Sequence, residues 1–259
     1  MLDILLPTYN RKSRLETCLY ALTLQDPPLP RSHRVIICED YSPDPVEDTV
    51  KTFSDKLNIE FYRMDENKGT AAVRRFLISK LKQKLVMWLD DDVILFKDAI
   101  YLHMIGCSME NAGVSVGTME DIIEEESEII LHHSLEARID LMAEKAKPEG
   151  REKFENPQNY IKAWGAAWTG NLMMLKEHGD KVGWLDEDVV GWGHDDTVLT
   201  VKLVGEGIPM WYDKNIRGYH LRQDAGRRGN LGLGYHDTAL KNSVILNKYL
   251  RKYNITWEG

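Results

Sequence analysis

Short apolar segments alternate with amphipathic segments through the first ninety residues, and this alternation constrains the fold more than any other feature. Four apolar segments predict buried strands: residues 2–6, 34–38, 59–62 and 85–89. Between them, residues 11–24 and 69–81 carry apolar side chains at helical spacing, which predicts helices. Strands that alternate with helices form a mostly parallel sheet with helices on both faces. The sequence therefore predicts an α/β protein.

Polar side chains directly follow three of the predicted strands. They are Thr8-Tyr9-Asn10-Arg11, Glu39-Asp40-Tyr41-Ser42 and Asp90-Asp91-Asp92. Ligands of open α/β sheets bind at the carboxyl ends of the strands. We therefore expect these three segments to converge on one binding crevice.

The three consecutive aspartates, Asp90, Asp91 and Asp92, are the sharpest chemical signal in the sequence. Adjacent carboxylates repel one another unless a cation neutralises them, and Mg²⁺ or Mn²⁺ prefers carboxylate and phosphate oxygens. In an extended segment Asp90 and Asp92 point to the same side. A solvated turn or a helix N-cap also favours aspartate. The position directly after an apolar segment nevertheless favours a metal and nucleotide site.

A second acidic motif, Gly191-Trp192-Gly193-His194-Asp195-Asp196, leads into a predicted helix at residues 194–204. Acids at the start of a helix can simply cap it and complement its dipole. Trp192 between two glycines adds an aromatic platform on which the apolar face of a sugar ring can stack. Core packing of the indole is an equal alternative.

Other features are weaker. Ser115 lies in a G-x-S-x-G pattern, but the nucleophile elbow of serine hydrolases needs a strand before it and a helix after it, and residues 114–116 themselves resemble the strand. The acidic residues within 119–128 are typical of a solvated face, and His132-His133 of a surface pair. Residues 217–234 contain five glycines and four arginines, which predicts a mobile loop that could close over a site.

The composition excludes several classes of protein. The chain has 259 residues and a formal net charge of −8, which argues against a nucleic-acid binder. Its three cysteines, Cys18, Cys38 and Cys107, lack zinc-type spacing, which indicates reduced thiols and a cytoplasmic location. Asp3 and Pro7 interrupt the N-terminal apolar segment, so we expect no signal peptide, and we expect no membrane span. Peripheral contact with a membrane is left open, and so is the oligomeric state.

Five motifs occur in the order found in family 2 glycosyltransferases of the GT-A fold, which the chain resembles from residue 2 to about 220. They are Ile4-Leu5-Leu6-Pro7-Thr8-Tyr9-Asn10-Arg11, Cys38-Glu39-Asp40-Tyr41-Ser42, Asn67-Lys68-Gly69 with Ala72-Val73-Arg74, Trp88-Leu89-Asp90-Asp91-Asp92, and Trp184-Leu185-Asp186-Glu187 with Gly191–Asp196. They resemble the family's opening strand and nucleotide loop, its V-D-D-G-S, N-x-G…A-R-N and D-x-D motifs, and the G-F-D-E…G-W-G-x-E-D of galactosyltransferase-like members. Any one motif is weak evidence for the family, whereas five motifs in this order are strong evidence.

The resemblance implies a single GT-A domain over residues 1–259. Within it, residues 1–117 would form the nucleotide-sugar-binding half, residues 118–236 the acceptor-binding and catalytic half, and residues 237–259 a C-terminal helix. The implied activity is a metal-dependent, inverting transfer of a sugar from a UDP-sugar to a hydroxyl of a glycan, glycolipid or other glycoconjugate.

The resemblance also implies roles for individual residues. The nucleotide would be bound by Pro7, Thr8, Asn10, Arg11, Asp40, Arg74, Asp90 and Asp91, with Asp40 on the uracil ring. Asp92 and His220 would ligate Mn²⁺ or Mg²⁺, which stabilises the charge of a leaving diphosphate; a satisfied core or surface histidine is the alternative for His220. Asp196 would be the catalytic base, and Asp195 and Trp192 would bind the acceptor.

The chain departs from the family pattern at Glu39, Tyr41, Arg75 and Asp195, where Asp, Gly, Asn and Glu are usual. Two rival functions stay open. A sugar nucleotidyltransferase would need a glycine-rich phosphate loop, which the segment at residues 7–10 lacks; a non-catalytic module would bind a nucleotide sugar or glycan without turnover. The donor sugar, acceptor and linkage are not readable, because residues 117–160 carry no motif.

Overall fold

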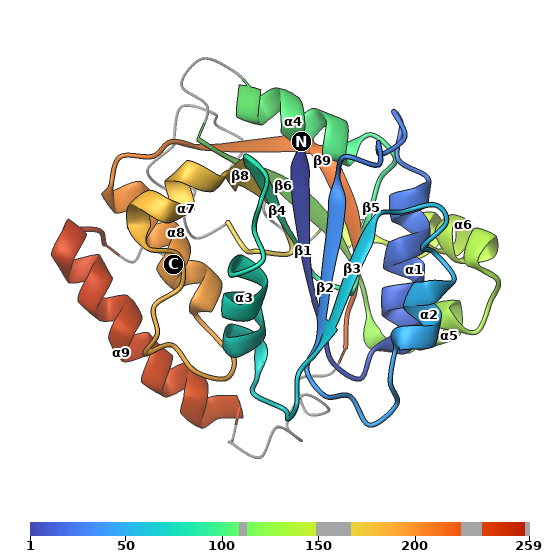
Figure 1. Ribbon diagram of the computed structural model, residues 1–259, viewed down its shortest axis with the longest axis horizontal. Coiled ribbons are helices and arrows are strands. Elements are labelled where there is room, and N and C mark those ends of the chain that lie inside the picture. The colour runs from blue at the N-terminus through green and yellow to red at the C-terminus, as the bar shows by residue number, and fades with distance from the viewer. Residues whose placement is uncertain (109–112, 149–166, 224–234, 257–259) are drawn as a thin grey trace.

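The structure is a computed structural model that describes residues 1–108, 113–148, 167–223 and 235–256 (Figure 1). In these residues one sheet of nine strands carries helices on both faces. The strands are β1 (Leu2–Thr8), β2 (Arg34–Glu39), β3 (Ile59–Arg63), β4 (Leu85–Leu89), β5 (Val93–Leu95), β6 (Val114–Ile122), β7 (Lys147–Pro148), β8 (Asn171–Leu175) and β9 (Met210–Leu221). The helices are α1 (Lys12–Thr23), α2 (Glu47–Lys51), α3 (Thr70–Ile78), α4 (Ala99–Ser108), α5 (Glu124–Leu131), α6 (Leu135–Lys145), α7 (Lys176–Val182), α8 (Asp195–Gly205) and α9 (Tyr235–Tyr253).

The strand order is β3-β2-β1-β4-β8-β6-β9-β5, with β7 paired to β6. Strands β1 to β4 are parallel, as the alternation of strands and helices predicts. The second half of the chain extends the same sheet with β8, which is antiparallel to both β4 and β6. Strand β9 is parallel to β6 and antiparallel to β5. The α/β fold is therefore confirmed, with a parallel first half and a mixed second half.

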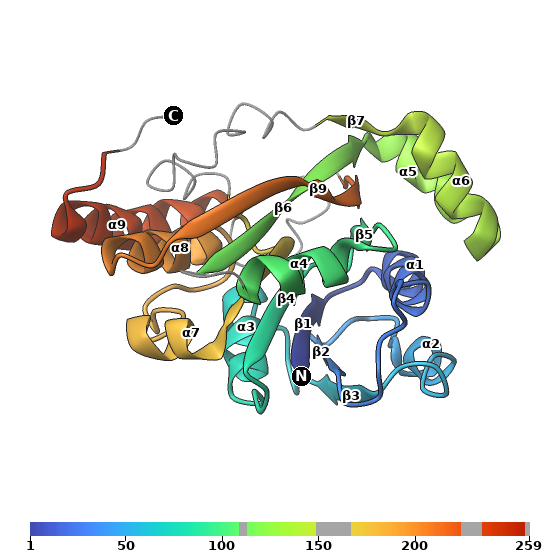
Figure 2. The same cartoon turned by 90° about the horizontal axis from the view of Figure 1, so that it is seen from above.

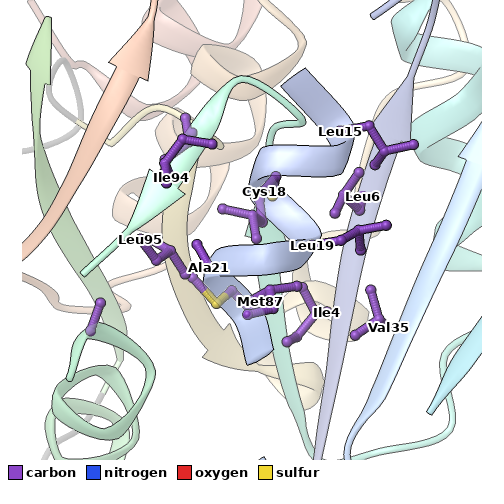
Figure 3. Packing of buried hydrophobic residues seen from close by; sticks show 14 of the residues in the cluster. Ile4, Leu6, Leu15, Cys18, Leu19, Ala21, Val35, Met87, Ile94 and Leu95 are labelled. Carbon is purple, nitrogen blue, oxygen red and sulfur yellow. The ribbon is translucent and has the colours of Figure 1, made fainter. Parts of the chain in front are cut away.

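Each central strand buries both of its faces. On β1, Ile4 and Leu6 pack beneath α1 against Leu19 and Met87, as Figure 3 shows. Leu5 points to the opposite face, in the cluster covered by α3, α8 and α9 (Figure 2). This alternation with a period of two explains the continuous apolar segments of the parallel strands. Complete burial of each such side chain contributes about 1.5–3 kcal/mol.

The parallel register brings the polar segments after β1, β2 and β4 to one edge of the sheet. Thr8 lies opposite Glu39, and the N–H of Asp40 donates to the carbonyl of Thr8 at 2.9 Å. Strand β4 runs beside β1 on its other side, so the aspartates after Leu89 reach the same edge. The predicted convergence of the three polar segments is present in the structure.

Two predicted features differ from the structure. Arg217 to Leu221 belong to β9 rather than to a loop, because Ile216, Tyr219 and Leu221 are buried while Arg217 pairs with Glu120; the remaining part of the predicted mobile loop, residues 224–234, lies outside the described residues. The acidic run within residues 119–128 is not merely a solvated face. It spans the end of β6 and the start of α5, and some of its carboxylates reach the candidate site.

Within the described part of the chain, no helix combines the length and the apolar character needed to cross a membrane. The three cysteines are buried and free, as their spacing predicts. His132 and His133 are exposed.

Candidate active site

A cleft of about 900 Å³ lies at the polar edge of the sheet and is lined by every residue to which the family resemblance assigns a role. These residues are Pro7, Thr8, Asn10, Arg11, Asp40, Arg74, Asp90, Asp91, Asp92, Trp192, Asp195, Asp196 and His220. They come from the end of β1, from the loops after β1, β2 and β4, from α3, from the loop before α8 and the start of α8, and from β9. The fold thus brings into one cavity segments that are more than two hundred residues apart in the sequence.

Asp40 is held by the loop that precedes α3. Its Oδ1 accepts the N–H of Lys68 and its Oδ2 accepts the N–H of Gly69, both at 2.8 Å. Burial raises the pKa of Asp40 and these two amide bonds oppose the rise. A carboxylate can accept about four hydrogen bonds, so Asp40 retains acceptor capacity toward the cleft.

The Asn67-Lys68-Gly69 and Gly191-Trp192-Gly193 loops contact each other through their backbones. The N–H of Ala71 donates to the carbonyl of Gly191 at 3.0 Å. Gly69 has a φ of +82°, and a Cβ added there would lie 2.8 Å from the Cα of Gly191. Only glycine accommodates both this conformation and this approach. The close contact explains the glycine at position 69, whereas a Cβ at Gly191, whose φ is +61°, would lie 2.8 Å from Cγ2 of Thr238.

Arg74 joins the two acidic motifs of the cleft. From α3, its Nη2 donates to Oδ1 of Asp90 at 2.8 Å and its Nη1 donates to Oδ2 of Asp195. Arg74 is 5% exposed and Asp195 is 3% exposed. Each terminal nitrogen thus contacts one carboxylate and carries a second N–H, and Arg74 lines the cleft. Removal of one partner of such a buried ion pair strongly destabilises the folded protein, because the other charge stays buried without compensation.

Asp196 is the half-buried second acid of the α8 motif. Its Oδ1 accepts the backbone N–H of Thr197 at 2.7 Å and the Thr197 hydroxyl at 3.1 Å. Burial and the neighbouring charge of Asp195 raise the pKa of Asp196 to about 6, against the opposing influence of Arg74. A carboxylate with this pKa is ionised at neutral pH and is a stronger base than an ordinary aspartate.

Asn242 of α9 fixes the backbone of the loop that carries Trp192. Its Oδ1 accepts the N–H of Val190 at 3.1 Å. Its Nδ2 donates to the carbonyls of Val190 at 2.8 Å, Trp192 at 3.4 Å and Gly193 at 2.7 Å. The sequence gives no signal for this role, since Asn242 lies in an ordinary helical pattern about fifty residues further along the chain.

Arg11 lies against the aspartate triplet. Its Nη1 donates to Oδ1 of Asp91 at 2.8 Å and to Oδ2 of Asp92 at 2.7 Å, and its Nε donates to Oε1 of Gln223 at 2.9 Å. The two aspartate side chains are 3% and 5% exposed. Burial raises the pKa of Asp91 to about 6, which the charge of Arg11 opposes.

His220 on β9 faces Asp92, with 3.9 Å between its Nε2 and Oδ2 of Asp92. Its Nδ1 is 2.9 Å from Oδ1 of Asp121, the neighbour of His220 in the β6–β9 register. Histidines that ligate metals usually donate the N–H of their other ring nitrogen to such a carboxylate. Burial opposes a charged ring, but the bond to Asp121 and the charge of Asp92 raise the pKa of His220.

The donor set fits Mg²⁺ or Mn²⁺ with a partly open coordination shell. Among the described residues, no group of three or more His, Cys, Asp or Glu side chains is arranged to hold a metal ion. Asp92 and His220 would therefore supply only part of a shell. Divalent ions of this kind commonly complete their shell with water and substrate phosphates.

Sequence reasoning missed several residues of the cleft. Trp168, which is 43% exposed, lines it, and so do Ile123, Glu124, Glu125 and Gln223. Their sequence neighbourhoods contain no motif, and only the fold brings them into the cleft that Trp192 and Asp196 also line.

Ser115 belongs to a buried polar network. Its Oγ is 2.8 Å from Nδ1 of His103, and Nε2 of His103 is 2.8 Å from Oδ1 of Asn171. All three side chains are at most 1% exposed, and none lines the cleft. Burial lowers the pKa of His103 to about 4, so the ring is neutral at physiological pH. Residues 114–116 belong to β6, as the sequence predicts, and a serine in the core is not the exposed nucleophile of a hydrolase.

The departures from the family pattern have local explanations. Glu39 is completely buried and pairs with Arg63 at 2.8 Å. Tyr41 has a φ of +58°, a conformation that favours glycine, and Arg63 lies 5.0 Å from its ring centroid. Arg75 donates to the backbone carbonyls of Asp186 and Val189, and none of these three residues lines the cleft.

Comparison with solved structures defines the class of the fold. TarS from S. aureus in complex with UDP-GlcNAc superposes with a TM-score of 0.68 at 14% identity, covering 96% of this chain and 66% of that one. GalNAc-T7 with UDP, GalNAc and Mn²⁺ also gives 0.68 at 13% identity, covering 96% of this chain and 47% of that one. The chain therefore has the GT-A glycosyltransferase fold.

Sequence comparison then gives the family. Residues 3–179 match the family model described as Glycosyl transferase family 2, and the chain belongs to this family. Validoxylamine A glucosyltransferase from Streptomyces hygroscopicus subsp. limoneus is 23% identical over 98% of this chain and 57% of its own length. Chondroitin synthase from Escherichia coli is 25% identical over 85% of this chain and 34% of its own length. The chain thus spans about half or less of these curated relatives. The family match ends before residue 184, so the galactosyltransferase-like form of the second acidic motif stays a prediction.

Proposed function

We propose that this chain transfers a sugar residue from a nucleoside diphosphate sugar, first of all a UDP-sugar, to an acceptor hydroxyl with inversion. The observation that carries the proposal is the single cleft in which two separate acidic motifs face each other across Arg74. One motif directly follows β4 and the other begins α8. Regular secondary structure of this kind holds functional side chains in a defined position. Membership of family 2 and the UDP and UDP-GlcNAc complexes of TarS support the same function.

On the donor side, the loops after β1 and β2 would bind the nucleotide. Pro7, Thr8 and Asn10 line this end of the cleft, and Asp40 would accept the ring N–H of uracil. Asp90 and Asp91 also line the cleft and would contribute to nucleotide binding. Arg74 would fix Asp90, and the N–H groups that its terminal nitrogens retain would donate to the nucleotide.

Asp92 and His220 would hold Mn²⁺ or Mg²⁺, which supplies positive charge that stabilises a departing diphosphate. The hydrogen bond that Nδ1 of His220 donates to Asp121 would orient the ring and leave its Nε2 toward Asp92. GalNAc-T7 and the mannosyltransferase PcManGT from Pyrobaculum calidifontis were both solved with Mn²⁺, which supports a divalent ion in this fold.

On the acceptor side, Asp196 would remove the proton of the attacking hydroxyl. Its raised pKa of about 6 leaves it ionised at neutral pH while increasing its basicity. General-base catalysis of this kind contributes about 10²–10⁴-fold to the rate. Asp195, fixed by Arg74, would accept a hydrogen bond from the acceptor. Trp192, together with the exposed Trp168, offers aromatic surface for sugar rings.

Release of UDP tests this function. The wild-type protein with Mn²⁺ should release UDP from at least one of UDP-glucose, UDP-galactose and their N-acetyl forms. Asp196→Asn should bind UDP with unchanged affinity by calorimetry and lose at least about a hundredfold in turnover. Asp188→Asn is the matched control, because Asp188 is exposed outside the cleft.

The two rival functions give different results in the same assay. Tight binding of UDP-sugars without release of UDP in the presence of any acceptor would favour a binding module. Formation of a UDP-sugar from UTP and a sugar phosphate would favour a nucleotidyltransferase.

A further inference from the structure

The Arg11 side chain occupies the place that a cation needs. One of its nitrogens, Nη1, contacts both Oδ1 of Asp91 at 2.8 Å and Oδ2 of Asp92 at 2.7 Å. The same Oδ2 of Asp92 faces Nε2 of His220 at 3.9 Å. A divalent ion bound by Asp92 and His220 would therefore compete with the guanidinium for one carboxylate oxygen.

Arg11 is well placed to make this contact and to leave it. It directly precedes α1, in the loop after β1, and its side chain is 19% exposed at the wall of the cleft. Its third contact is a single hydrogen bond from Nε to Gln223. Asp91 and Asp92 are almost fully buried. Such carboxylates need a counter-charge when they are ionised, and in this structure Arg11 contacts both of them.

The displaced guanidinium has an obvious second partner. A diphosphate bound beside Asp92 would bring negative oxygens to the wall that Arg11 forms, and the planar fork of arginine matches phosphate geometry. The same side chain can then neutralise the aspartates before the ion is bound and the diphosphate afterwards.

We propose that Arg11 is a positioning residue that exchanges partners: it contacts Asp91 and Asp92 while no divalent ion is bound, and the diphosphate once an ion is bound. This inference rests on the proposed function. It makes the binding of metal and nucleotide mutually reinforcing, because each ligand removes a competitor of the other, and such coupling is reciprocal. The metal site is competent only in the fraction of molecules whose Arg11 has moved away, which weakens the apparent affinity by that fraction.

The test measures binding of Mn²⁺ alone and of UDP at saturating Mn²⁺, by electron paramagnetic resonance and calorimetry. Arg11→Gln should bind Mn²⁺ alone on the order of tenfold more tightly, yet bind UDP in the presence of Mn²⁺ more weakly. A residue that only supports the fold would weaken both affinities when it is replaced. Equal or weaker binding of Mn²⁺ by Arg11→Gln would overturn the proposal.

Arg222→Gln is the matched control for charge. Arg222 lines the same cleft, but its guanidinium contacts Asp121 at 3.2 Å and its side chain is 58% exposed. Loss of this positive charge should change the affinity for Mn²⁺ far less than Arg11→Gln does. An equal gain in both variants would show that general electrostatics, and not exchange of partners, sets the affinity.

A second measurement needs no variant. Phenylglyoxal modification of Arg11 in the wild-type protein, followed by peptide mass spectrometry, should increase when Mn²⁺ is added and decrease again when UDP follows. Unchanged labelling at a concentration where Mn²⁺ is bound would contradict the exchange. If neither the wild type nor Arg11→Gln binds Mn²⁺ with or without UDP, the proposed function fails as well. Binding by the wild type without tightening in the variant overturns this inference alone.

Discussion

Arg74 and Asp195 form a buried ion pair that ties the helix start carrying Asp196 to the aspartates after β4. The guanidinium of Arg74 contacts Asp195 with one nitrogen and Asp90 with the other. The donor and acceptor sides of the cleft are thus not independent. Removal of Arg74 leaves Asp90, Asp195 and Asp196 without the cation they share.

Replacement of Arg74 by Gln should therefore change both stability and pH dependence. Breaking a buried ion pair costs about 3–5 kcal/mol, measurable by denaturant unfolding. Because the charge of Arg74 lowers the pKa of Asp196, its loss should move the acid limb of the rate profile to higher pH. Arg75→Gln, which loses only bonds to backbone carbonyls, should leave the limb in place. An Arg74→Gln limb that coincides with that of the wild type would rule out this coupling.

The pH dependence of the wild-type rate follows from the base. Asp196 must be ionised to accept a proton, and its pKa is raised to about 6. At saturating Mn²⁺, kcat/KM should be constant above pH 7 and should fall about tenfold per unit well below pH 6. Asp91 has a similarly raised pKa, so Asp91→Asn separates the two groups. Disappearance of the limb in Asp91→Asn would assign it to Asp91 instead.

The contact between Asp121 and His220 should control metal affinity. Loss of a carboxylate that orients a ligating histidine typically costs about 10–100-fold in affinity. Asp121→Ala should weaken binding of Mn²⁺ in the presence of UDP by this amount, measured by calorimetry. Glu120→Ala is the control, since Glu120 neighbours Asp121 on β6 but pairs with Arg217. Equal affinities in Asp121→Ala and the wild type would remove His220 from the coordination shell.

Asn242 should matter for turnover although it lies behind the cleft. Asn242→Ala leaves the N–H of Val190 and the carbonyls of Trp192 and Gly193 without this partner, and an unsatisfied buried group costs about 1–3 kcal/mol. Displacement of Trp192 by about an ångström can cost on the order of a hundredfold in rate. We expect lower kcat/KM and lower stability. Asn247→Ala, on an exposed part of the same helix, should change neither.

The first half of the fold was predictable from local patterns. The segments that form β1, β2, β3 and β4 are short apolar runs between helical patterns. Both faces of β1, β2 and β4 are buried, whereas the edge strand β3 is half-buried. The second half was harder, because β8 and β9 join the sheet through pairings between residues far apart in the chain. Glycine and arginine content around Arg217 suggested a loop, whereas pairing with β6 makes it a strand.

The candidate site was predictable to the extent that motifs mark it. Asp40, Asp90 and Asp196 occur in ordered motifs, and the structure brings them to one cleft. Asp121 and Asn242 carry no local signal, since their roles depend on what β9 and the Trp192 loop place beside them. The partners of Arg11 and Arg74 were not predictable either. The sequence gives the charges of these arginines but not which carboxylates they contact.

The central claim is that this cleft binds a nucleoside diphosphate together with a divalent ion at Asp92. A crystal structure of the protein with UDP and Mn²⁺, with an anomalous difference map to locate manganese, tests it most directly. The account predicts an anomalous peak in contact with Asp92, His220 and the diphosphate, with uracil beside Asp40 and Arg11 turned toward phosphate. Absence of a peak at Asp92, or UDP bound outside this cleft, would contradict it.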